Sequence, residues 1–216
     1  MARTPKASKS RTQKPTKRPA KSAAKAKRRV TRIVPSKRKR RTSSIDFDLP
    51  TDPNQQLIAG AIFSESTAGA NANADEKRCI GLCIVNMAYY ATLTQDSGKP
   101  CYNSSFGDGS ILSAIKKNIY GYGSAQWKKV MDADAMKSKD DLEDSLTASE
   151  VKHLKGSVEA SATAIAATAP ASDSASGRIP VQFNQAANNP PSTREEKIAR
   201  YASETFYAFK TGRECQ

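Results

Sequence analysis

The chain has 216 residues and a formal net charge of +14, but that charge is concentrated at one end. Residues 1–45 contain 18 of the 35 Lys and Arg and no Asp or Glu, so the other 171 residues carry 17 basic and 21 acidic side chains, a net charge of −4. The folded part is therefore not expected to be a basic, nucleic-acid-binding domain. There is no apolar run of about 18 residues, and the basic start is not followed by an apolar core, so we expect neither a membrane span nor a cleaved secretory signal.

The first 45 residues are predicted to be a disordered basic tail. They are rich in Pro, Ser, Thr and Ala, and they have too few large apolar side chains to offset the entropy lost on ordering. As a polycation, the tail is expected to bind nucleic acid or another polyanion without sequence preference. The alternative is an appendage that serves only solubility or delivery. The predicted polyanion-binding residues form two clusters: Lys27, Arg28, Arg29, and Lys37, Arg38, Lys39, Arg40, Arg41.

The remaining residues, 46–216, suit one domain of ordinary size, and its first helix is expected from about Pro53 to Glu65. Asp52 is a good N-cap and Pro53 fits the first helical turn. Glu65 ends the apolar run of this helix and precedes a stretch of small, polar residues. A carboxyl group with apolar side chains behind it and a loop in front is placed to have a raised pKa, as a general acid requires. The alternative is a solvated acid in the last turn of a helix.

A second apolar helix is predicted from about Asp75 to Leu93, because acidic residues favour a helix N-terminus. Asn86 lies within its apolar face. A buried amide must find hydrogen-bond partners, so Asn86 either holds neighbouring backbone in place or lines a polar cleft.

The four cysteines leave two interpretations open. Cys79 and Cys83 share a face of the second helix, and either could form a disulfide with Cys101 or Cys215. The alternative is that they are buried free thiols. With no Cys-x-x-Cys pair and a single, distant histidine, His153, no metal site is expected, and no cofactor is predicted.

Residues 94–109 have the composition of a loop, and a short helix is expected from Ser110 to Asn118. The following segment alternates aromatic residues and glycines, which is suited to a groove wall that stacks on a ring of a ligand. Ser124 is expected to cap the next helix, where Trp127 is either a core anchor or a cleft residue. The candidate ligand-binding side chains of this region are Tyr120, Tyr122 and Gln126.

The rest of the chain is read as mostly helical. Thr147 and Glu150 form a capping box that begins a helix reaching about Ala169. A brief extended segment around Phe183 follows, and its polar neighbours are either sugar-binding groups or an ordinary surface loop. These neighbours are Gln182, Asn184, Gln185, Asn188 and Asn189. A last helix is predicted from about Thr193 to Lys210, with Gly212 as its stop. The predicted fold class is thus mostly α, with a cleft built by loops.

The order of these parts resembles the cell-wall hydrolases of the spore cortex-lytic type, within the lysozyme-like superfamily. In that family an apolar helix ends in Gly-Glu-Ala, a second apolar run ends in Val-x-Asn-Arg-Val, and a Gln-Phe segment follows. Here the corresponding residues are Ser64-Glu65-Ser66, Val85-Asn86-Met87 and Gln182-Phe183, with Met87 standing where the family has Arg. Glu65-Ser66 also matches the Glu-Ser of lytic transglycosylases.

The resemblance implies a lysozyme-like helical fold and cleavage of the glycan strand of peptidoglycan, by a muramidase or lytic transglycosylase mechanism with Glu65 as general acid and base. The candidate sugar-binding residues are Asn86, Tyr120, Tyr122, Gln126, Gln182 and Asn184. Asp75, Glu76 and Asp108 are the candidates for a second carboxylate, but none has a compelling position in the sequence, which favours a mechanism with one acid. Such an enzyme would be a delivered effector or a phage lysin, reaching the cell wall without a cleaved signal. The alternative is a nuclear or nucleoid protein acting through its basic tail.

Overall fold

The computed structural model of the chain describes residues 44–66, 73–95, 97–99, 101, 105–184, 193–211 and 215. The predicted polyanion-binding clusters of the basic tail lie outside these residues, as do Gln185, Asn188 and Asn189. Ile45, which the charge distribution places in the tail, is buried, and its N–H donates to Glu143 Oε1 at 2.8 Å. The folded region therefore includes at least the last residue assigned to the tail.

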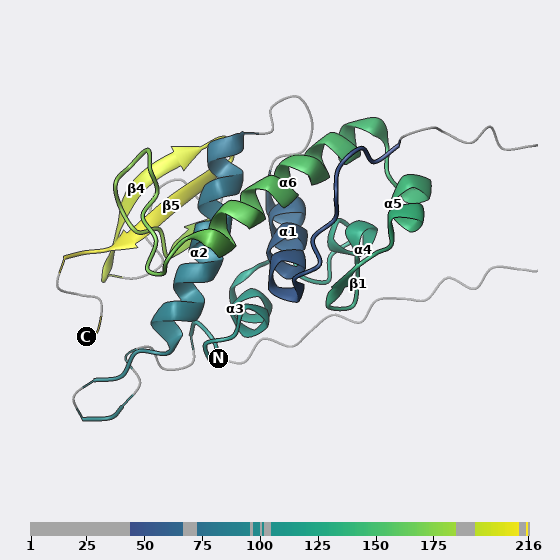
Figure 1. Cartoon of the computed structure of the whole chain (residues 1–216). Helices are drawn as coiled ribbons and strands as arrows, with labels where there is room; N and C mark the ends of the chain where they lie inside the picture. Colours follow the sequence, from purple (N-terminus) through teal and green to yellow (C-terminus); the bar gives the residue numbers. More distant parts are fainter. Residues whose placement is uncertain are drawn as a thin grey trace, which may run out of the picture. The chain divides into compact units, whose positions relative to one another are not determined.

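Six helices are present within the described residues (Figure 1). The helices predicted near residues 53–65, 75–93, 110–118 and 148–169 are confirmed. The N-cap of the short α4 is Gln126 and not the predicted Ser124, although Ser124 Oγ accepts the Trp127 N–H at 3.2 Å. Helix α5 was not predicted. The bounds are α1 Pro53–Glu65, α2 Ala74–Ala91, α3 Ile111–Asn118, α4 Trp127–Val130, α5 Lys139–Ser145 and α6 Ala148–Ala166.

The predicted last helix is wrong, because residues 193–210 form two antiparallel strands, β4 (Glu195–Tyr201) and β5 (Glu204–Phe209). β5 is central in a three-stranded sheet, with β3 (Gln182–Asn184) on its other edge. A second, smaller hairpin joins β1 (Met131–Asp132) to β2 (Ala135–Met136). Of the described residues, 46% are helical and 14% are in strands, so the domain is mixed and the predicted mostly α fold class is only partly right.

Two-residue turns explain why both hairpins were missed. The turns are Ala133-Asp134 and Ala202-Ser203, and each begins with an alanine at positive φ, 52° and 46° respectively. Such turns normally carry Asn, Asp or Gly at these positions, and neither alanine gives that signal. The apolar residues of 193–210 also match helical spacing, while all six residues of β5 are buried, so no alternation marks this strand.

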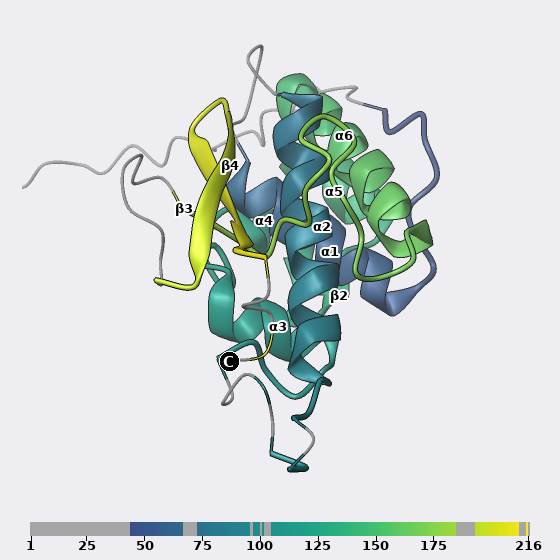
Figure 2. The ribbon, with the colours of Figure 1, turned by 90° about the vertical axis from the view of Figure 1, so that its left-hand side faces the viewer.

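Helix α1 is the centre of the core. Its residues Leu57 to Phe63 are all buried, so this part of the helix is apolar on every side. α6 and α2 pack against it, and α2 also contacts β3 and β4 of the three-stranded sheet (Figures 1 and 2). Trp127 is 2% exposed and donates from Nε1 to Ala133 O at 3.1 Å, which makes it a core residue.

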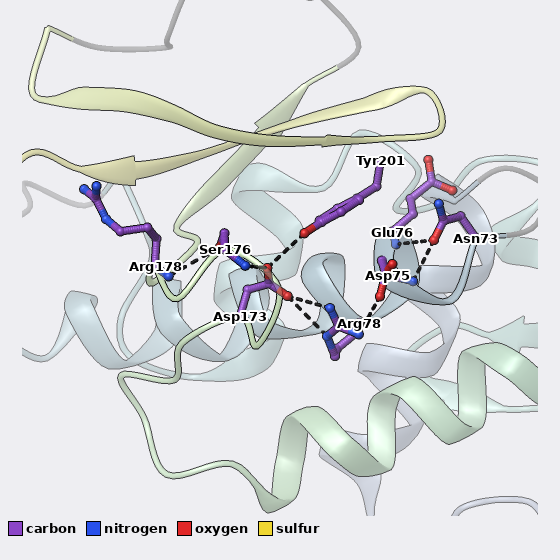
Figure 3. Close-up of polar contacts among 8 residues, drawn as sticks. All are labelled: Asn73, Asp75, Glu76, Arg78, Asp173, Ser176, Arg178 and Tyr201. Atoms are coloured by element: carbon purple, nitrogen blue, oxygen red, sulfur yellow. Dashed lines mark hydrogen bonds and ion pairs between the residues drawn. The ribbon is translucent and has the colours of Figure 1, made fainter.

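The segment between α6 and β3 has no regular structure, and two polar side chains of α2 hold it. Asn86 donates to Ala171 O and Pro180 O at 2.9 and 2.8 Å and accepts from Ala171 N–H at 2.7 Å. About two turns earlier on α2, Arg78 donates to Asp173 (Figure 3). Asp173 also accepts a hydrogen bond from the Tyr201 hydroxyl of β4. Both interactions fix the start of β3 relative to α2.

The cysteine pairing differs from the predicted one. The disulfide joins Cys101 to Cys215, which brings a residue near the end of the chain to the loop after α2. Cys79 and Cys83 are buried free thiols, the second of the two interpretations of these residues. Their burial on α2 raises both thiol pKa values well above the ordinary range, which makes them poor nucleophiles.

None of the helices in the described ranges combines the length and the apolar character needed to cross a membrane.

Candidate functional site

Glu65 lies on the wall of an open cavity of about 330 Å³. This volume is at the lower end of the range of ligand pockets, about 300–1,000 Å³. α1 supplies Glu65, α3 and the loop after it supply Asn118 and Tyr120, β3 supplies two residues, and β5 supplies one. The lining residues are Glu65, Asn118, Tyr120, Phe183, Asn184 and Glu204.

The Glu65 carboxyl is half-buried, and burial raises its pKa above the ordinary value. The Gly121 N–H donates to Oε1 and lowers that pKa, but by less than burial raises it. Among the described residues no cation lies within ion-pair distance of this carboxyl. A carboxyl with a raised pKa keeps its proton to a higher pH than an ordinary glutamate does, and beside an open cavity it can donate that proton to a bound ligand.

Gly121 brings the loop after α3 against the end of α1. A Cβ built at this position would lie 2.5 Å from Ser64 Oγ and 3.0 Å from Glu65 Oε1. Only a glycine allows the backbone N–H to approach the carboxyl this closely. The alternating aromatic and glycine residues noted in the sequence thus have a specific use, because Gly121 positions the acid.

Tyr120 is 97% exposed, although the adjacent loop residues Ile119 and Gly121 are buried. Its ring stands at the rim of the Glu65 cavity. A large exposed aromatic ring at the edge of a pocket is suited to stacking on the apolar face of a sugar ring.

Two of the six predicted substrate contacts, Tyr120 and Asn184, share the cavity with Glu65. Asn184 Oδ1 accepts from the Tyr207 hydroxyl at 3.1 Å, which orients its amide.

The structure places the other four predicted contacts elsewhere. Asn86 is fully buried and holds backbone, so the cleft-lining alternative does not describe it. Tyr122 packs on Trp127 and donates to Asp134, and Gln126 is exposed outside the cavity. The Gln182 amide lies 3.0 Å from both carboxylate oxygens of Glu195, to which its NH₂ donates in the orientation that satisfies both groups.

Sequence reasoning missed Glu204, a second carboxylate in the same cavity. It is 1% exposed and begins β5, directly after the Ala202-Ser203 turn. Because residues 193–210 were predicted to form a helix, nothing in the sequence indicated that Glu204 lies in the same cavity as Glu65, 139 positions earlier in the chain. Recognising the hairpin would have been the signal needed to find it.

Comparison with protein-family models, with curated proteins and with solved structures gives no match for this chain. The described residues include no group of three or more His, Cys, Asp or Glu arranged to hold a metal ion.

Proposed function

We propose that the domain cleaves the glycan strand of peptidoglycan, with Glu65 as the general acid. The observation that carries the proposal is the position of this carboxyl, half-buried with a raised pKa on the wall of a cavity edged by an exposed tyrosine. The similarity of Ser64-Glu65-Ser66 and Val85-Asn86 to the motifs of lysozyme-like cell-wall hydrolases supports the same substrate. On this proposal the helical part of the domain is a lysozyme-like fold.

In the proposed reaction Glu65 gives its proton to the glycosidic oxygen as the bond to the sugar C1 breaks. Glu204 supplies a second carboxylate in the same cavity, which a hydrolytic route needs in order to activate water or to form a bond to C1. In the lytic route, the Glu65 carboxylate instead takes the proton of the muramyl 6-hydroxyl as that oxygen bonds to C1, and no water is used. The two routes differ by one water in the mass of the product.

The test is the rate at which purified protein clears a peptidoglycan suspension. Glu65→Gln keeps the shape of the side chain but cannot donate a proton, so we expect the rate to fall by about 10²-fold or more. Glu196→Gln is the matched control, because Glu196 of β4 pairs with Arg178 and does not line the cavity. This variant should leave the rate unchanged. A Glu65→Gln protein that clears as fast as the wild type contradicts the proposal.

The pH dependence of the same rate provides a second readout. A general acid acts only while protonated, so the rate should fall as the pH rises through the raised pKa of Glu65.

Replacing Glu204 by Gln should abolish hydrated products if that residue serves the hydrolytic route, and should leave anhydro products if the lytic route operates. Mass analysis of the released fragments distinguishes these outcomes.

A second candidate function rests on the 18 basic residues of positions 1–45, which favour binding of nucleic acid or another polyanion. Deletion of residues 1–43 tests it and spares the buried Ile45. We expect DNA binding by the full chain to weaken steeply with salt and to disappear on deletion, while peptidoglycan clearing persists. DNA binding that survives the deletion would assign it to the acidic domain and contradict this role for the tail.

A further inference from the structure

A second cavity, of about 360 Å³, lies between α2 and α6 and shares no residue with the Glu65 cavity. The first turns of α2 and the middle of α6 form its walls. The lining residues are Ala74, Lys77, Arg78, Lys152, Gly156, Glu159, Ala160 and Thr163.

Lys77 is the unusual residue of this cavity, because it is only 3% exposed. Its Nζ donates to His153 O at 2.7 Å, and of the described residues this carbonyl is the only hydrogen-bond acceptor within reach. No carboxylate of the described residues lies within 4 Å of the ammonium group. A buried ammonium group with one of its three N–H groups satisfied is costly unless an anion or further acceptors complete its surroundings.

The titration of the neighbouring groups agrees with this geometry. Burial lowers the pKa of Lys77 to about 8, although the charges of Glu76 and Glu159 act in the opposite direction. Burial, and then the charge of Lys77, lower the pKa of His153 to about 4, so the imidazole is neutral and adds no competing cation. The positive charge of Lys77 is therefore only partly compensated.

The absence of a side chain at Gly156 leaves space for the Lys77 ammonium group. A Cβ at this position of α6 would lie 3.0 Å from Lys77 Nζ, so the missing side chain leaves space on the side of α6 that lines the cavity. Arg78 is already bound to Asp75 and Asp173 and contributes little free charge. Lys152, exposed at the edge of the cavity, is the second cation available to a ligand.

We propose that this cavity binds a small oxyanion, a phosphate or carboxylate group, with Lys77 as the buried cation and Lys152 at the rim. The site is independent of the proposed glycan cleavage, because neither its residues nor its chemistry are shared with the Glu65 cavity. Glu159 on the same wall repels anions and limits the negative charge that the cavity can accept, so a single phosphate or carboxylate group is the expected ligand.

The experiment titrates isotope-labelled full-length protein with inorganic phosphate, and in a second arm with acetate, at constant ionic strength. NMR signals of the Gly156 amide and of the Lys77 side chain report the cavity itself, so that phosphate bound by the basic tail does not contribute. We expect saturable shifts with a dissociation constant of about 1 mM or tighter for at least one anion. The bound anion should raise the pKa of Lys77 by about one unit or more.

Three variants test which residues produce the NMR shifts on anion binding. Lys77→Met should abolish the shift at Gly156, and Lys152→Gln should weaken binding several-fold. Lys155→Gln removes another α6 lysine, which lies near Asp46 and does not line the cavity, and should bind as the wild type does. Signals of Gly156 and Lys77 that do not move with either anion in the wild-type protein would overturn the proposal, leaving Lys77 only its contact between α2 and α6. Equal binding by Lys77→Met and wild type would overturn it as well.

Discussion

Glu65 and Asp173 are both carboxylates removed from bulk water, but their surroundings are opposite. Asp173 has no exposed surface and accepts hydrogen bonds from Arg78, from the Ser176 N–H and from the Tyr201 hydroxyl (Figure 3). Burial alone would raise its pKa, but these donors lower it to about 2. Glu65 has one donor among the described residues, Gly121 N–H, and burial raises its pKa.

The difference has opposite consequences for stability. The folded pKa of Asp173 is depressed, so its contribution to stability is present above the ordinary carboxyl value and is lost as the pH falls toward about 2. The folded pKa of Glu65 is raised, so the fold loses stability as the pH rises from the ordinary carboxyl value through that raised pKa. Asp173 therefore supports the fold at neutral pH, whereas Glu65 weakens it.

The largest expected effect comes from breaking the Asp173 network. Asp173→Asn leaves Arg78 without its buried partner, and we expect the free energy of unfolding to fall by about 3 kcal/mol at neutral pH. Urea unfolding measures it. Asp75→Asn is the control, since Asp75 binds the same Arg78 with a side chain that is 45% exposed, and it should cost less than about 1 kcal/mol. Equal losses in the two variants would show that burial does not distinguish these carboxylates.

The sequence predicts the elements that have local signals and misses the contacts between distant segments. α1, with its Asp52 cap, and α6, with its Thr147–Glu150 capping box, were predictable because caps and apolar runs are local signals. The β4–β5 hairpin was not, because Ala202 at positive φ gives no turn signal. The end of α1 fixed Glu65 as a candidate acid, but Glu204 and the donors of Asp173 come from distant segments that only the tertiary fold brings near.

A smaller effect is expected where the loop after α3 meets Glu65. Gly121→Ala places a methyl group against Ser64 and Glu65, so the backbone must shift, at a cost of about 1–3 kcal/mol of unfolding free energy. Moving the Gly121 N–H away also removes the one donor that lowers the pKa of Glu65, so this pKa should rise further. Glu65 thereby becomes even less like Asp173.

Gly123→Ala separates these two effects. A Cβ at Gly123 meets open space, but its φ of 72° strains an alanine, so stability should fall by about 1 kcal/mol while the titration of Glu65 stays unchanged. Carboxyl-selective NMR titration of Glu65 makes the measurement. If Gly123→Ala shifts the Glu65 titration as much as Gly121→Ala does, the hydrogen bond is not what sets that pKa.

The smallest effect on stability, and the one most specific to the proposed function, is expected at the rim of the cavity. Tyr120 is 97% exposed, so Tyr120→Ala should change the unfolding free energy by less than about 0.5 kcal/mol. In a Glu65→Gln background, which binds without cleaving, loss of the ring should weaken the affinity for peptidoglycan oligosaccharides by about 1 kcal/mol, roughly fivefold. Tyr120→Phe keeps the stacking face and should bind as the parent does. Equal affinity of the Ala and parent proteins would mean that the sugar does not pass over this ring, and would separate the position of the acid from the path of the glycan strand.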